Sequence, residues 1–107
     1  MFTRIVELTT KPGKNEQLSA TINDKVLPIL KKQKGFVDEM VFVSDKDNNR
    51  VLGISFWNTR EDAEQYQRTE YSKVQETVRP LLDAEPVVRT YEVHTSTTHK
   101  IAAGKAA

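Results

Sequence analysis

One order of predicted elements occurs twice along this chain, and this repetition constrains the fold more than any other feature. A strand-like run at residues 2–9 is followed by a helical stretch and by a second strand-like run at residues 36–44. After a polar turn, a third strand-like run at residues 51–57 is followed by more helix and by a fourth strand-like run at residues 87–95. The predicted order is therefore βαββαβ.

This order is that of the split βαβ, or ferredoxin-like, arrangement of the α+β class. It predicts a four-stranded antiparallel sheet that carries its helices on one face only. With 107 residues the chain is long enough for one domain with a modest core. We expect that domain at residues 1–95 and a flexible tail at residues 96–107, with extension of the last strand into the tail as the alternative.

Several residues predict where the helices bend, begin and end. Pro28 predicts a bend in the first helix, because proline lacks an N–H and clashes with the preceding turn. Gly35 is expected just beyond the end of that helix. Thr59, three residues before Asp62, is expected to cap the second helical region. The run at residues 70–72 is expected to divide that region.

Apolar residues on both faces of the third strand predict a dimer. The face with Leu52, Ile54 and Phe56 is expected to contact the helices, and Trp57 lies on the opposite face. Apolar residues on the other strands would leave an uncovered patch on the order of several hundred Å², which monomers rarely expose. Packing of the sheet against that of a second copy is the simplest cover.

Composition excludes several classes of function. The formal net charge is +1 with 29% charged residues, which argues against an electrostatic nucleic-acid binder. The absence of cysteine excludes disulfides and thiolate sites. The first residues lack a signal-peptide pattern, and the longest strongly apolar run, residues 26–30, is too short to span a bilayer. We therefore expect a soluble, cytoplasmic protein with no membrane partner.

Short motifs lie at two junctions between the predicted elements. Lys34-Gly35-Phe36 ends the bent first helix, and Phe56-Trp57 ends the third strand just before the acidic helix start at residues 59–63. In these motifs and in its order of elements, from Phe2 to about Thr95, the chain resembles the antibiotic biosynthesis monooxygenase (ABM) superfamily of dimeric α+β barrels. The resemblance implies a homodimer with a small cavity between each sheet and its helices. Some members oxidise aromatic phenols with molecular oxygen and no cofactor, others cleave haem, and many have no known activity.

The haem-cleaving branch of that superfamily uses a tryptophan and a histidine ligand in the second helical region. The corresponding positions in this chain hold Tyr66 and Glu76. A carboxylate is a poor substitute for the imidazole that binds haem iron. We therefore expect neither a haem cofactor nor haem degradation.

Four side chains are candidates for a substrate site, and each also has a purely structural interpretation. Trp57 either stacks on an aromatic ligand or anchors the junction of strand and helix. Tyr66 and Tyr71 either orient a substrate oxygen or line the core. His94 is a candidate general base because imidazole titrates near neutral pH, and it is otherwise a surface residue.

Other charged residues have simpler explanations. Glu92 and His94 share a strand face but lack a third ligand at short spacing, so we expect no metal site. Arg4 and Glu7 lie within the first strand, and Arg89 and Glu92 lie within the last. Ion pairs across strands or across a dimer would account for these four residues.

Together, the residues and the resemblance predict an ABM-like cofactor-independent monooxygenase that acts on a small phenol or quinol. Two alternatives are open at this stage. One is a non-catalytic ligand-binding or stress-related dimer of the same fold, and the other is an isomerase or decarboxylase on the same scaffold. Binding of a ligand without turnover would favour the non-catalytic alternative.

Overall fold

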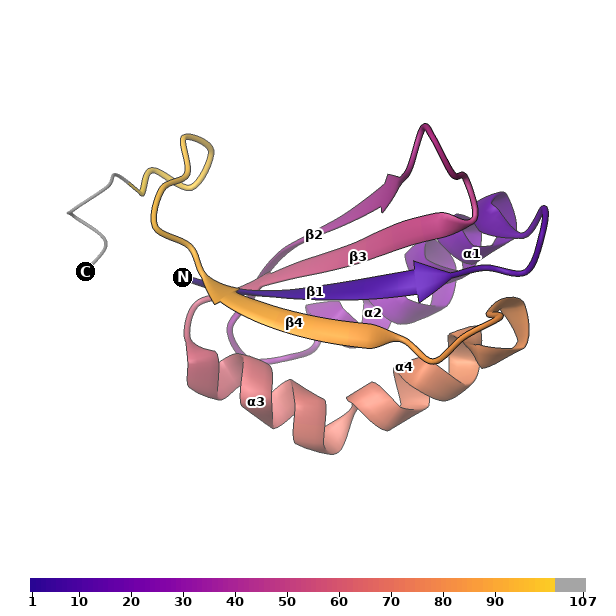
Figure 1. Cartoon of the computed structure of the whole chain (residues 1–107). Helices are drawn as coiled ribbons and strands as arrows, with labels where there is room; N and C mark the ends of the chain where they lie inside the picture. The colour runs from indigo at the N-terminus through magenta and orange to yellow at the C-terminus, as the bar shows by residue number, and fades with distance from the viewer. Residues whose placement is uncertain (102–107) are drawn as a thin grey trace.

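Four strands form a single antiparallel sheet in the order β2-β3-β1-β4. The structure is a computed structural model and describes residues 1–101. All the helices lie on one face of the sheet, and the predicted ferredoxin-like α+β fold is thereby confirmed (Figure 1). The strands are β1 (Phe2–Thr9), β2 (Phe36–Val43), β3 (Arg50–Trp57) and β4 (Val87–Glu92).

The first helical region changes its winding part-way along. Helix α1 (Asn15–Thr21) continues into a π-helical segment (Ile22–Val26) and then into α2 (Leu27–Lys31). The N–H of Leu27 bonds to the carbonyl of Ile22, five residues earlier, just before Pro28. Pro28 cannot donate a backbone hydrogen bond and its ring crowds the preceding turn. The predicted bend thus takes the form of a widened turn.

The second helical region begins and divides where the sequence predicts. It consists of α3 (Arg60–Thr69), α4 (Tyr71–Val78) and a 3₁₀ turn (Arg79–Leu81). The side chain of Thr59 accepts a hydrogen bond from the backbone N–H of Asp62 at 3.1 Å. Gly35 has a φ of 79°, and a Cβ at this position would overlap the Asp62 carboxylate, so glycine is required there.

The helices cover the face of the sheet opposite to the expected one. Trp57 and Val51 are fully buried beneath the helices, whereas the side chains of Leu52 and Phe56 lie on the other face. The expectation that Leu52, Ile54 and Phe56 contact the helices is therefore wrong. On the covered face, the small residues Gly53 and Ser55 of β3 leave room for large side chains from α3 and α4, such as Tyr66 and Tyr71.

A register shift in β2, between Phe36 and Asp38, decides which side chains of this strand meet the helices. Beyond this bulge, Glu39 pairs with Ser55 and points to the helix-covered face, whereas Asp38 and Met40 point to the open face. Adjacent carboxylates on β2 therefore lie on opposite sides of the sheet.

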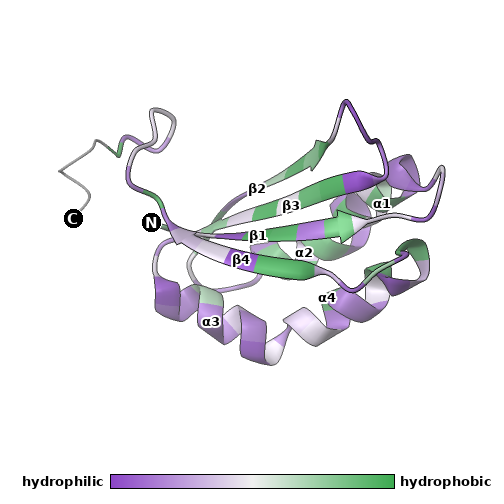
Figure 2. Ribbon diagram, viewed as in Figure 1, coloured by the Kyte–Doolittle hydropathy of each residue, from purple (hydrophilic) through white to green (hydrophobic). Residues whose placement is uncertain are grey.

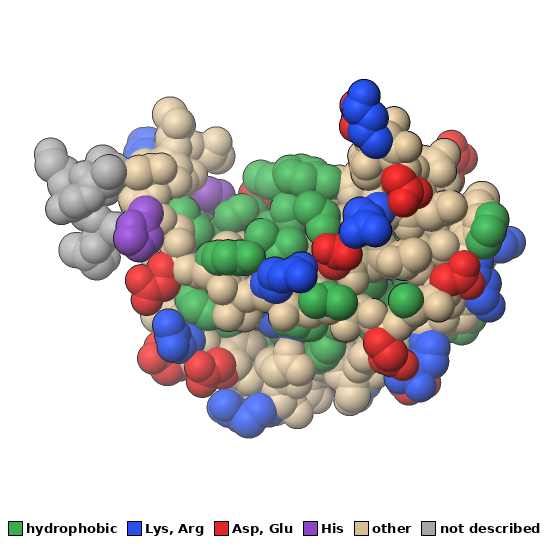
Figure 3. All heavy atoms as spheres, viewed as in Figure 1, with side chains coloured by type: hydrophobic (Ala, Val, Ile, Leu, Met, Phe, Trp, Pro, Cys, Tyr) green, Lys and Arg blue, Asp and Glu red, His purple; other side chains and the backbone are tan. Residues whose placement is uncertain are grey.

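The open face of the sheet is apolar over much of its area. Hydrophobic side chains gather over the strands between the C-terminal segment and the β2–β3 hairpin (Figure 3). Phe42 is 50% exposed and Tyr91 is 49% exposed on this face. The hydropathy colouring shows green, hydrophobic stretches along the strands, whereas α3 is mostly purple and white (Figure 2).

The last strand ends at Glu92, and the chain beyond it does not continue the sheet up to residue 101. Ser96 and Ile101 form an isolated bridge that closes a short turn. Within this turn His99 packs against Phe56 and lies 3.8 Å from the Asp38 carboxylate. Residues 102–107 of the predicted tail lie outside the described residues. In residues 1–101 no helix has the length and apolar character that crossing a membrane requires.

Candidate functional site

A cavity of about 60 Å³ lies between the helix-covered face of the sheet and the helices. A single water needs roughly 10–15 Å³ by a comparable measure, so the cavity has room for several waters or a small apolar group. Its walls are mostly aliphatic and come from the strands, the π-helical segment, α2 and α4: Val6, Leu8, Ile22, Val26, Leu30, Val74 and Val78. The π-helical segment contributes two of these residues, which links the bend at Pro28 to the shape of the cavity.

Gly53 forms part of the cavity wall at the middle of β3. A Cβ built at this position would meet only Leu8 Cδ1, at 3.9 Å, so nothing occupies the adjacent space. Glycine weakens a strand interior and often marks a close approach of another group to the backbone. Gly53 therefore gives the cavity volume at the expense of strand stability.

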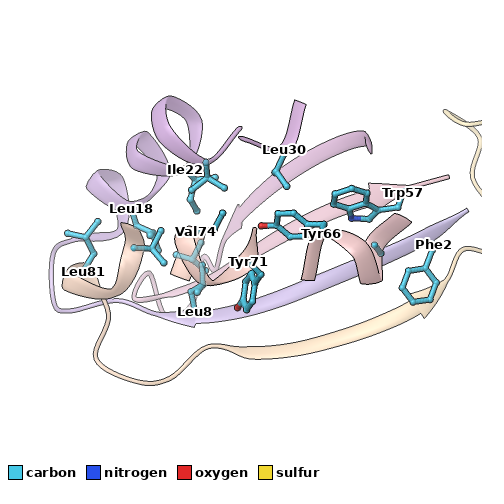
Figure 4. Close-up of a cluster of buried hydrophobic side chains, with 14 residues drawn as sticks. Phe2, Leu8, Leu18, Ile22, Leu30, Trp57, Tyr66, Tyr71, Val74 and Leu81 are labelled. Carbon is cyan, nitrogen blue, oxygen red and sulfur yellow. The ribbon is translucent and has the colours of Figure 1, made fainter. Parts of the chain in front are cut away.

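Three aromatic side chains lie next to one another, with Trp57 and Tyr66 stacked and Tyr66 and Tyr71 edge to face (Figure 4). Trp57 is fully buried and stacks on Tyr66, with ring centroids 5.1 Å apart and an interplanar angle of 28°. Its Nε1 donates a hydrogen bond to Ser55 Oγ at 2.9 Å. Tyr66 and Tyr71 line the cavity, and Trp57 supports Tyr66 from behind without lining it.

Arg4 is the one cationic side chain of the cavity wall, and it is only 3% exposed. Its guanidinium lies 4.6 Å from the ring centroid of Tyr71 and 5.2 Å from that of Tyr66. It donates a hydrogen bond to Gln67 Oε1. Burial lowers the pKa of Arg4, and the neighbouring tyrosines oppose this shift.

The ion pair expected for Arg4 does not form with any residue in the described part of the chain. The prediction holds instead for Glu7, which lies on the open face and bonds to Arg50 at 2.9 Å and to Arg89 at 3.4 Å. Glu92 pairs with Arg60 at 3.6 Å. The reason is orientation, because Arg4 and Glu7 are three positions apart on one strand and therefore point to opposite faces.

Glu39 is the carboxylate of the cavity wall. Burial raises its pKa, and the negative charge of the adjacent Asp38 raises it further. The strand register places Glu39, Ser55 and Arg4 in one row across β2, β3 and β1. Since neighbouring strands are about 4.8 Å apart, Glu39 and Arg4 originate roughly 10 Å apart, on either side of Ser55.

The two cavity tyrosines are held in their neutral form. Burial raises the pKa of Tyr66 to about 12, and burial also raises the pKa of Tyr71. Both hydroxyls therefore remain available as hydrogen-bond donors across the neutral and moderately alkaline range.

Of the four candidates from the sequence, the structure brings Trp57, Tyr66 and Tyr71 together. His94 is exposed, follows β4 and is not part of the cavity wall. Within residues 1–101, no group of three His, Asp or Glu side chains is placed to hold a metal ion.

The sequence analysis missed Arg4, Glu39 and Gly53 as residues of the site. For Arg4 a signal was present, because it occupies the same strand face as Phe2 and Val6 and thus interrupts an apolar row. For Glu39, the bulge in β2 changes the face of the sheet to which the side chain points, so the alternation of residues in the sequence did not predict it.

Comparison with known proteins identifies the family. The family model for antibiotic biosynthesis monooxygenases matches residues 1–74. The chain belongs to this family. No curated protein matches the chain.

Solved structures of the same fold extend the comparison over the sheet and the helices. A monooxygenase from the gene ActVA-Orf6 of Streptomyces coelicolor, in complex with the ligand Nanaomycin D, has a TM-score of 0.77 at 15% identity, over 89% of this chain and 88% of that one. SnoaB, a cofactor-independent oxygenase from Streptomyces nogalater, has a TM-score of 0.75 at 12% identity, over 90% and 95%. Rv0793 from Mycobacterium tuberculosis has a TM-score of 0.71 at 13% identity, over 90% and 97%. At these identities the likeness shows the fold.

Proposed function

We propose that this family member is a cofactor-independent monooxygenase that acts on a small phenol or quinol bound in the cavity. The observation that carries the proposal is the makeup of the cavity wall, which is aliphatic except for a few convergent polar groups. Such a wall takes an aromatic ring out of water and fixes its orientation through those polar groups. The oxygenase names of two structural neighbours are consistent with this function.

The reaction begins with removal of a proton from the substrate hydroxyl. Glu39 is the proposed base, because its raised pKa brings its basicity closer to that of a phenol and its side chain lines the cavity. His94, the base considered from the sequence, has no such position. Tyr66 and Tyr71 orient the ring, and Trp57 holds Tyr66 in place.

The electron-rich ring carbon of the phenolate then reacts with dioxygen. One oxygen atom becomes bonded to that carbon, and the other leaves as water when the O–O bond breaks. A phenol and dioxygen thereby give a quinone and water, so the substrate supplies all the electrons. No external reductant enters this balance.

We further propose that the protein acts as a homodimer joined through the open face of the sheet. Exposed apolar side chains such as Phe42 and Tyr91 have no cover within the described residues of one chain. A second copy that packs its own open face against this one would remove both patches from water.

A panel of hydroxylated aromatics and quinols tests the proposed function. Each compound is screened for an increase in melting temperature and then for enzyme-dependent oxygen uptake, with quinone formation followed by absorbance. We expect at least one single-ring quinol to give both signals. A thermal shift without oxygen uptake across the panel would contradict the monooxygenase and favour a non-catalytic binding protein.

A further inference from the structure

Arg4 is a buried cation without a buried anion beside it. Only 3% of Arg4 is exposed to solvent. No carboxylate of residues 1–101 lies within ion-pair distance of its guanidinium. Burying a charge is costly unless it is paired and hydrogen-bonded. Proteins usually tolerate such a cost only where the charge has a role, as at a binding site.

The neighbours of Arg4 reduce this cost but do not neutralise the charge. Tyr66 and Tyr71 present their rings to the guanidinium at 5.2 and 4.6 Å, which is within cation–π range. Gln67 accepts one hydrogen bond from it. A guanidinium carries five N–H donors, so its hydrogen bonds to Gln67 and to the side chain of Tyr71 leave donors for another acceptor.

Arg4 lies where two hollows of the molecule meet. Arg4 contributes to the wall of the cavity and also to the wall of a second hollow of about 220 Å³ between α3 and β4. The wall of that hollow also includes Arg60 and two carboxylates, Glu64 and Glu92, and Glu92 pairs with Arg60. Arg4 thus lies between an apolar interior and a larger, more polar hollow, where a ring would lie on the interior side and its oxygen would meet the guanidinium.

We propose that Arg4 selects the ionised form of the ligand, so that the site binds phenolates in preference to neutral phenols. The inference rests on the proposed function. It adds the charge state in which the substrate binds and the residue that recognises this charge. An opposite charge at about 4–6 Å lowers the pKa of an acid by roughly 1–3 units. A bound phenol should therefore ionise at lower pH than the same phenol in water, by a factor of at least about ten in its acid constant.

Other titratable groups around the cavity act in the opposite sense or are neutral. Glu39 on β2 repels a phenolate while it is ionised, but as the proposed base it becomes neutral when it takes the proton of the phenol. Tyr66 on α3 and Tyr71 on α4 are neutral at neutral pH, because burial raises the pKa of each. Glu64 on α3 and Glu92 on β4 line the hollow on the other side of Arg4, where Glu92 is paired with Arg60, so Arg4 is the one cation of the cavity wall itself.

The test uses 4-nitrophenol, whose phenolate is yellow and whose neutral form is not. Quenching of the single tryptophan, Trp57, measures binding of either form, and the yellow absorbance of the bound ligand measures its ionisation. Both are recorded as a function of pH for the wild type, Arg4→Gln, Arg4→Lys and the control Arg89→Gln. Arg89 is a suitable control, because it lies on the adjacent strand but faces the open side and pairs with Glu7.

We expect wild type and Arg89→Gln to bind the phenolate at least about tenfold more tightly than the phenol. Arg4→Gln should lose this preference and still bind the neutral form, and Arg4→Lys should retain part of it. If wild type binds both forms equally, the role of Arg4 is overturned while the proposed site stands, and this result needs no variant to fold. If Trp57 reports no binding of either form, the proposed function and the inference both fail.

Discussion

Arg4 and Glu7 lie three residues apart on β1, and their surroundings differ as much as the two faces of the sheet do. On the open face, Glu7 is shared by two arginines, Arg50 and Arg89, whose side chains are each about half exposed. On the helix-covered face, Arg4 is almost fully buried and has aromatic rings and an amide as neighbours. The arginines on the first face are paired with a carboxylate, whereas no carboxylate of the described residues pairs with Arg4 on the second.

The difference between the two faces agrees with the dimer and the ligand site proposed above. Exposed ion pairs contribute little to stability but keep a surface compatible with water or with another protein surface. A buried cation is costly without a partner, and no carboxylate of the described residues pairs with Arg4. We therefore interpret the open face as a surface for a second copy and the covered face as a site for a small anionic ligand.

The largest effect should come from a charge on the open face. Phe42→Asp would place two carboxylates, related by the dimer symmetry, in an apolar interface, where each unpaired charge costs several kcal/mol. We expect light scattering at micromolar concentration to give the mass of a dimer for the wild type and of a monomer for this variant. Val43→Asp is the matched control, because Val43 is 41% exposed but points to the other side of β2. A wild type that is monomeric under these conditions would rule out the proposed interface.

The two carboxylates at the bulge of β2 should differ strongly in their effect on turnover. Glu39→Gln removes the proposed base, and loss of a general base typically lowers the rate by at least about 100-fold. Asp38→Asn, on the open side of the same strand, should change the rate only slightly, through its effect on the pKa of Glu39. Oxygen uptake with the quinol identified in the screen is the measurement. Equal losses in the two variants would show that the covered face has no special role in proton removal.

Alkaline pH should weaken the covered face through Tyr66. Its pKa is about 12 in the folded protein and about 10 in an unfolded chain. Between these values only the unfolded state releases the proton, so the free energy of unfolding falls as pH rises, by about 3 kcal/mol in total. Tyr66→Phe should reduce this fall, as measured by urea unfolding at neutral and alkaline pH. An unchanged alkaline fall in the variant would mean that Tyr66 is accessible to water.

The smallest effect is expected from a larger side chain at Gly53, which should raise the stability of the protein and lower its affinity for the ligand. Gly53→Val places a β-branched side chain in a strand and fills part of the cavity. We expect the free energy of unfolding to rise by roughly 0.5–1 kcal/mol, which raises the melting temperature by about 2–8 °C. Ligand affinity should fall about tenfold, since the new methyl groups occupy the space of the ring. A variant that is both less stable and fully able to bind would contradict the role of Gly53.

The element order, the Thr59 cap and the break before α4 could all be predicted, because each depends on residues close together in the sequence. The covered face could not, because β3 is apolar on both sides and hydropathy alone does not distinguish a core from a surface for a second copy. Glu39 was missed for a related reason, since one bulged residue reverses the facing of the strand beyond it. Trp57 was identifiable by its place at the strand–helix junction, and Tyr66 by its correspondence to a site position of the family that the chain resembles. The cavity depends on the packing of elements that are distant in the sequence.

The central claim is that the ligand binds on the covered face and the second copy on the open face. The most direct test is a titration with 4-nitrophenol, followed by Trp57 fluorescence, in wild type, Phe42→Asp and Gly53→Val. The cavity lies between the helices and the covered face of the sheet, away from the proposed interface, so we expect loss of the dimer to leave the site intact. The account predicts that Phe42→Asp binds within about twofold of the wild type and that Gly53→Val binds about tenfold more weakly. Loss of binding in Phe42→Asp, with full binding in Gly53→Val, would place the ligand on the open face and contradict the account.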